Sequence, residues 1–187
     1  MSAEWLTAIG TLGTFVVIAA SAIAALAQIR HMRAGNQIVA LNEVRETIES
    51  PSFQETVLLI RELPRRLSDP EVRRTLSETQ FPAEYQSLRT FANFFEHVGT
   101  LVKNRIIDGH IAADLWGGVI LRNWRELSPI ITNRRIVTRQ PQLWENFEYL
   151  AVLCDDFRLR HPGGAFPRGK RRMPPSQTWP EVVERRA

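Results

Sequence analysis

The sequence predicts an all-α protein with one N-terminal transmembrane helix, a cytoplasmic bundle-like domain of five or six helices, and a disordered basic tail. Three observations lead to this prediction. Residues 5–29 carry no charge, apolar residues recur at helical spacing over most of the remaining chain, and the last residues are rich in Pro, Gly and Arg. No stretch alternates convincingly with the period of two that is typical of β-strands.

The uncharged segment, residues 5–29, is long enough to cross a bilayer. At about 1.5 Å per residue it reaches about 37 Å, which exceeds a hydrocarbon core of about 30 Å. Ten of its 25 residues are Leu, Ile, Val or Phe, and these favour insertion. A cleaved signal peptide is the alternative, because Ala25-Leu26-Ala27 has the form of a cleavage site. The length of the apolar run and the lack of Lys or Arg before it favour the transmembrane helix.

The flanking charges predict the orientation of this helix. Residues 1–4 offer only Glu4 and the terminal amine, whereas Arg30, Arg33 and Arg45 follow the apolar segment. By the positive-inside rule, the N-terminus lies outside and the body lies in the cytoplasm. The single cysteine, Cys154, suits a reducing compartment.

Small residues occupy one face of the predicted transmembrane helix. Such a face lets two helices approach closely, and Ser or Thr can form hydrogen bonds across the contact. Self-association is one interpretation, and the ordinary frequency of small residues in membrane helices is the other. The residues of this small-residue face are Thr7, Gly10, Thr14, Ser21 and Ala24.

The body is predicted to contain a juxtamembrane helix over residues 30–50 and a helical cytoplasmic domain over residues 51–160. Ser50-Pro51 and Asp69-Pro70 have the composition of helix starts. The strongest soluble helix is expected over residues 84–107. A turn at Asp108-Gly109 leads to the next helix, which Ser128-Pro129 either kinks or restarts. Gln140-Pro141 is expected to open the last helix.

The tail, residues 161–187, is predicted to be disordered because it has too few apolar residues to offset the entropy of ordering. Residues 158–187 carry a net charge of +6, and the rest of the chain carries −2. The tail bases either contact anionic lipids of the inner leaflet or form a plain flexible segment, and nucleic acid is disfavoured. The candidate lipid contacts are Arg168, Lys170, Arg171 and Arg172.

Several motifs resemble an uncharacterised bacterial family, domain of unknown function 4760. The resemblance covers roughly residues 36–158 and rests on Asn93-Phe94-Phe95-Glu96, Leu101, Ile106-Ile107-Asp108, Trp124, Arg134-Arg135, and Trp144 followed by Phe147, Glu148 and Leu150. It implies a bacterial single-pass protein, and therefore the inner (cytoplasmic) membrane. The family transfers no catalytic residues.

No constellation in the sequence predicts a cofactor, a metal site or a catalytic site. His110 and Asp114 stand one helical turn apart, with His97 and Asp108 as further metal candidates, but no zinc motif accompanies them. Asp108 is instead expected to cap the following helix, and Cys154 is expected to be buried and structural.

Two charged groups have alternative interpretations. Glu96 shares a face with Ala92, Gly99 and Lys103, where it either pairs with an arginine from a neighbouring helix or lines a ligand pocket. Arg134, Arg135 and Arg139 cluster at one helix junction. A solvated surface is the expected environment, and contact with anionic headgroups or nucleic acid is the alternative.

Three functions fit this organisation. The favoured one is a membrane-anchored interaction module that presents its cytoplasmic domain to a protein partner or to a second copy. The first alternative is a regulatory or defence-type effector that acts through clustering of its transmembrane helices. The second is a membrane-tethered enzyme using Glu96, His97 or His110 as acid or base.

Overall fold

The computed structural model describes residues 3–173, except for the side chains of residues 5–9 and 84. Within this part of the chain there are six α-helices, one short 3-10 turn (η1) and no strand. The predicted all-α fold, a long apolar N-terminal helix followed by a helical domain, is therefore confirmed. The elements are α1 (Ala3–Glu49), α2 (Pro51–Arg66), α3 (Pro70–Leu76), η1 (Ala83–Tyr85), α4 (Gln86–Lys103), α5 (Gly109–Thr138) and α6 (Glu145–Arg160).

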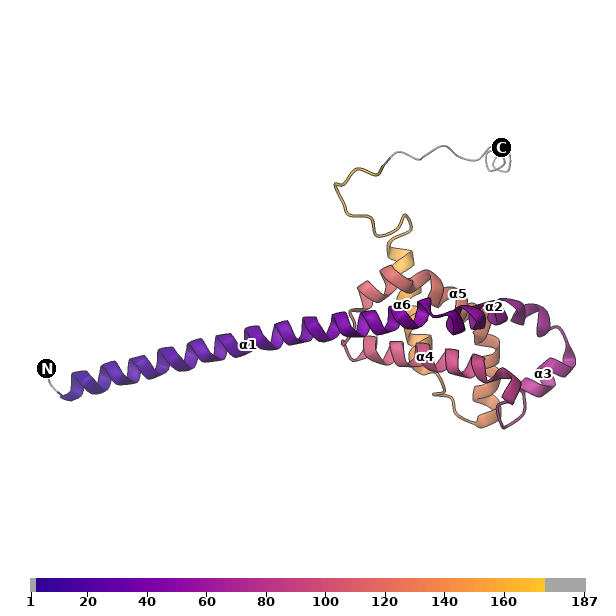
Figure 1. Ribbon diagram of the computed structural model, residues 1–187, viewed down its shortest axis with the longest axis horizontal. Helices are drawn as coiled ribbons and strands as arrows, with labels where there is room; N and C mark the ends of the chain where they lie inside the picture. Colours follow the sequence, from indigo (N-terminus) through magenta and orange to yellow (C-terminus); the bar gives the residue numbers. More distant parts are fainter. Residues whose placement is uncertain (1–2, 174–187) are drawn as a thin grey trace.

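Helix α1 projects from the body as a single rod (Figure 1). It has 47 residues, which corresponds to about 70 Å at 1.5 Å per residue. The helix continues through Gly35-Asn36, so the expected juxtamembrane helix is the second half of the same element. Only its last turns join the core, where Ala40 and Val44 are buried. The apolar run and the domain are thus connected without a break in the helix.

The predicted helix starts at Ser50, Asp69 and Asp108 are confirmed. Each of these side chains accepts a hydrogen bond from a backbone N–H in the first turn of its helix, and Pro51 and Pro70 stand at the first helical positions. A proline there costs little because the first N–H groups of a helix have no partner within it.

Helix α5 runs through Pro129, where the sequence left a kink or a restart open. Proline lacks the N–H that would bond to the carbonyl of residue 125. The hydroxyl of Ser128 donates a hydrogen bond to that carbonyl of Arg125 at 3.2 Å. This replacement partner helps the helix to continue past the proline.

The start of α6 differs from the prediction. Gln140-Pro141 does not open the helix, which begins at Glu145 after a turn. Two non-glycine residues with positive φ bound this turn, Arg139 (φ 55°) and Trp144 (φ 56°). The sequence contains no glycine there to signal such a conformation, so the boundary was placed too early.

Aromatic side chains from four helices meet in the centre of the domain. Phe53 of α2 lies 4.6 Å from Phe91 of α4, between ring centroids. Phe95 of α4 stacks on Phe147 of α6 at 4.8 Å, and Trp124 of α5 meets Phe147 edge-on at 5.1 Å. Helix α6 packs against both α4 and α5, and this arrangement positions the junction described next.

Candidate functional site

The carboxylate of Glu96 holds the N-terminus of α6. Its Oε2 accepts hydrogen bonds from the backbone N–H groups of Asn146 and Phe147, both at 2.9 Å, and its Oε1 accepts one from the Asn146 side chain at 2.7 Å. Helix α6 has no side-chain cap of its own at Trp144. A negative charge at a helix N-terminus is favourable because unpaired N–H groups point towards it. Glu96 therefore caps a helix that lies 50 residues away in sequence.

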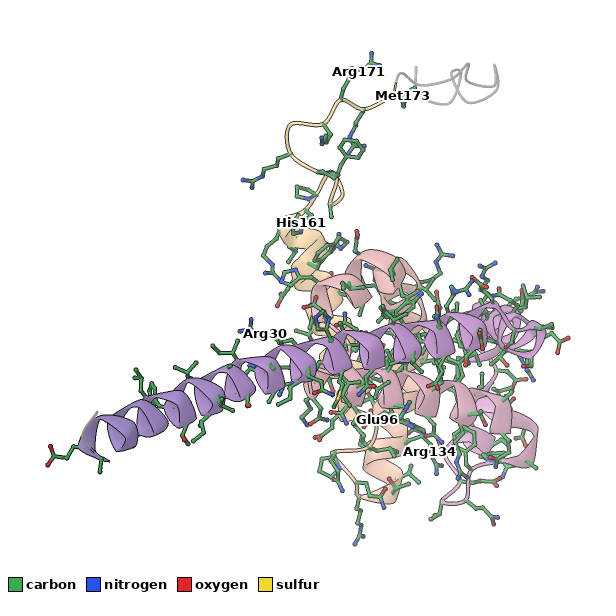
Figure 2. The ribbon with its side chains drawn as sticks, turned by 60° about the vertical axis from the view of Figure 1, so that its left-hand side comes forward. Arg30, Glu96, Arg134, His161, Arg171 and Met173 are labelled. Atoms are coloured by element: carbon green, nitrogen blue, oxygen red, sulfur yellow. The ribbon has the colours of Figure 1, made fainter. Side chains whose placement is uncertain are left out.

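The same face of α4 supplies further contacts to α6. The indole N–H of Trp144 donates to Oδ1 of Asn93 at 2.8 Å. Lys103 Nζ donates to Oδ1 of Asn146 at 3.2 Å and lies 3.7 Å from the Glu145 carboxylate. No arginine pairs with Glu96 in the described part of the chain, because α6 supplies its partners. Figure 2 shows Glu96 within the packed body.

The arginines at the α5–α6 junction have structural partners, so the expected solvated surface was wrong for two of the three. Arg134 is buried, its Nη atoms donate to the carbonyls of Glu78 and Thr79, and its guanidinium lies 5.2 Å from the centroid of the Phe81 ring. Burial lowers the pKa of Arg134. These contacts hold the segment between α3 and η1 against α5.

Arg135 connects the end of α5 to the beginning of α6. Its Nε donates to the carbonyl of Leu143 at 2.8 Å, and its Nη1 donates to the Glu148 carboxylate at 2.6 Å. Arg139 alone of the three is exposed. Arg134 and Arg135 bond mostly to backbone carbonyls in turns. The spacing of side chains in the sequence does not indicate such partners.

The candidate metal ligands do not form a cluster. Across residues 3–173, no three His, Cys, Asp or Glu side chains come together in a way that could hold a metal ion. Asp108 instead accepts hydrogen bonds from the backbone N–H groups of His110 and Ile111, at 2.8 and 3.1 Å, as expected for a cap. His97, His110 and Asp114 are exposed.

Cys154 is buried on the inner face of α6, as expected. Burial raises the pKa of its thiol to about 12. A thiol in this state is a poor nucleophile at neutral pH.

From Gly10 to Ile29, the apolar part of α1 is exposed on nearly all sides. Phe15, Val17 and Ile23 are 65–69% exposed. The carbonyl of Gly10 accepts a hydrogen bond from the hydroxyl of Thr14 at 2.9 Å, and a Cβ added at Gly10 would meet no atom within 4 Å. The small-residue face includes Ser21 and Ala24, which are also exposed, and Thr7, whose side chain lies outside the description. Self-association through this face stays a prediction.

Part of the predicted disordered tail lies outside the described residues, from residue 174 on. Residues 161–173 contain neither helix nor strand, and Figure 2 shows Arg171 and Met173 away from the body. Arg172 donates to the carbonyl of Gly163 at 2.7 Å and lies over the Phe166 ring. Arg168, Lys170 and Arg171 are exposed, and lipid contact by these side chains stays a prediction.

Comparison with protein families identifies the chain. The family model described as "Domain of unknown function (DUF4760)" matches residues 15–153. The chain belongs to the DUF4760 family. The match takes in the second half of the apolar run and most of the helical body. Neither a curated protein nor a solved structure matches the chain.

Proposed function

We propose that this DUF4760 protein is a single-pass protein of a bacterial inner membrane. Its α1 spans the bilayer with the N-terminus outside, and its helical domain is held at the cytoplasmic face, where it binds a protein partner or a second copy of the chain. A bacterial source and this topology are the parts of the proposal that the family resemblance and the flanking charges favour.

One observation carries the proposal. Among the described residues, α1 is the only helix that is long and apolar enough to cross a membrane. None of the residues in its most apolar stretch is buried. A core helix of a soluble protein would bury such a surface against its own domain. Large apolar side chains that project into water would favour aggregation, so they call for lipid or protein around them. A signal sequence meets the same criteria of length and composition, so the test must separate the two.

The interaction role is favoured over catalysis because the strongest candidate group, the carboxylate of Glu96, is already used as a helix cap. Glu96 is engaged by α6, whereas His97 and His110 are exposed on two different helices. General acid–base chemistry needs such groups within hydrogen-bond reach of one substrate. The proposed role needs only a folded surface at a fixed distance from the membrane.

The anchoring is tested by expressing the full chain with a C-terminal tag and extracting the membranes with alkaline carbonate. We expect the chain to stay in the membrane, to keep its own N-terminus by Edman sequencing, and to be cut at the tag only after the inner membrane is opened to protease. Release into the aqueous fraction, or an N-terminus beginning after Ala27, would overturn the anchoring.

The partner is tested by crosslinking in native membranes, with the same chain after denaturation as a control. We expect one discrete crosslinked species, either a dimer or a complex with one other protein. A ladder that looks the same for the folded and the denatured chain would contradict a specific interaction surface.

A further inference from the structure

A groove lies where α1 passes the loop between α4 and α5. It has a volume of about 630 Å³. Figure 1 shows this loop at the end of the body from which α1 projects. The lining residues are cationic, amide or apolar, and none is acidic. They include Arg33, Asn36 and Gln37 of α1, with Asn104, Arg105 and Ile106 of the loop.

The end of the groove at Arg33 stands at the depth of lipid headgroups if residues 5–29 span the bilayer. Arg33 is four residues beyond Ile29 and Gln37 is eight, which places them about 6 Å and about 12 Å past the end of the apolar run. The polar layer of a bilayer adds about 5–8 Å on each side of the hydrocarbon core. The long side chains of Arg33 and Arg105 therefore lie within reach of phosphate groups. Figure 2 shows Arg30, one turn before Arg33, on the part of α1 that leaves the body.

The chemistry of the groove fits a phosphate. Arginine presents several N–H donors in a planar fork that matches phosphate oxygens. The backbone N–H of Arg105 donates to the carbonyl of Val102 at 3.0 Å, but the guanidinium groups of Arg33 and Arg105 have no hydrogen bond or ion pair to the described residues. The nearby carboxylate of Asp108 is engaged by the first turn of α5, and the amide of Asn104 is fixed by its bond to the Thr100 carbonyl at 2.8 Å.

The loop also supports insertion beside a lipid. Ile106 is 44% exposed and follows Arg105, so an apolar side chain and a cation stand next to each other at the end of the loop. This pair suits the boundary between headgroups and acyl chains. Arg105 occupies a positive-φ position (58°) just after α4, where glycine is the favoured residue.

We propose that this groove binds the phosphate of an anionic phospholipid in the inner leaflet through Arg33 and Arg105. The proposal rests on the membrane anchoring proposed above. A free phosphate ion has the same chemistry, but the position of the groove beside the apolar run favours the lipid. Binding of this lipid would fix the distance and the rotation of the helical domain relative to the membrane.

The test is native mass spectrometry of the full chain in detergent, titrated with phosphatidylglycerol or phosphatidylcholine of matched acyl chains. We expect the wild-type chain to prefer phosphatidylglycerol, and R33Q and R105G each to weaken that binding about fivefold. The double variant should lose about thirtyfold, with phosphatidylcholine binding unchanged. R89Q is the matched control, since Arg89 is exposed near the far end of α4.

Three results would overturn the groove as a lipid site. The first is equal binding of the two lipids by the wild-type chain. The second is a phosphatidylglycerol preference that survives in R33Q/R105G but is abolished by replacing the tail bases. The third is inorganic phosphate that binds as tightly as the lipid. Both variants should stay folded. R105G places a glycine at a position with positive φ, where glycine is the least strained residue, and R33Q changes an exposed side chain on the surface of α1. A chain that resists carbonate extraction but shows no lipid preference would contradict the groove alone, whereas a chain released by carbonate would contradict the anchoring.

Discussion

The backbone of α6 passes so close to α4 at position 99 that the side chain there is limited to a hydrogen atom. A Cβ added to Gly99 would lie 2.1 Å from the carbonyl oxygen and 2.5 Å from the carbonyl carbon of Asn146. Backbone atoms at this distance cannot give way without moving α6. The same approach lets Glu96, one turn earlier on α4, reach the N–H groups of α6.

We predict that Gly99→Ala destabilises the domain by about 1–3 kcal/mol, since overpacking forces the two helices apart. Gly118→Ala is the control, because a Cβ at Gly118 in α5 would meet no atom within 4 Å. That substitution should stabilise the helix by about 0.5–1 kcal/mol. Urea denaturation in detergent, followed by tryptophan fluorescence, measures both. Equal effects of the two substitutions would contradict the close approach.

The buried thiol of Cys154 should react slowly in the folded chain. Its thiol has a pKa raised by burial to about 12, against 9.0 for an ordinary thiol. We expect maleimide labelling at neutral pH to be slow in the folded chain and complete within minutes in denaturant. Because the pKa in the folded state is the higher one, the contribution of the neutral thiol to stability is complete below pH 9.0 and is lost as the pH rises towards about 12. Rapid labelling of the folded chain would contradict the burial.

At the scale of elements, α6 depends on another helix for its beginning. We predict that Glu96→Gln destabilises the domain by about 1–2 kcal/mol, since the amide loses the charge and replaces one acceptor with a donor that faces N–H groups. Glu62→Gln on α2 is the control, because Glu62 is exposed. Hydrogen exchange should locate the loss, with faster exchange of residues 145–148 in Glu96→Gln only. Uniform acceleration along the chain would contradict a local role for Glu96.

The helices whose start signals are local could be predicted from the sequence. Ser50, Asp69 and Asp108 each bond to N–H groups within three residues, so a short motif is sufficient. The start of α6 could not be predicted in this way because its cap, Glu96, is 50 residues away. The role of Arg134 was hidden for the same reason, since its acceptors are carbonyls 55 and 56 residues earlier.

The groove at the α4–α5 loop could not be predicted from the sequence. Arg33 and Arg105 are 72 residues apart, and nothing in their spacing indicates that α1 and the loop lie side by side. The last turns of α1 join the core through Ala40 and Val44, and the residues before them line the groove with the loop. The family motifs, by contrast, were recognisable because they contain core residues such as Phe95, Trp124 and Phe147.

At the scale of the whole molecule, the apolar run and the domain should be separable. We predict that a chain beginning at residue 36 is soluble and folded, because it keeps Ala40 and Val44, the buried residues of α1. A chain beginning at residue 51 loses both and should be less stable by about 2–3 kcal/mol. Circular dichroism and urea titration of the two fragments make the comparison. Equal stability would contradict the participation of α1 in the core.

The unbroken course of α1 has a mechanical consequence for the proposed topology. A flexible linker between anchor and domain would let the domain rotate independently, whereas a continuous helix couples the two. A tilt or rotation that neighbouring lipids or helices impose on residues 5–29 is therefore transmitted along α1 to the helical domain, where Val44 is buried. In such a molecule, the state of the bilayer and the orientation of the cytoplasmic domain are linked by rigid geometry.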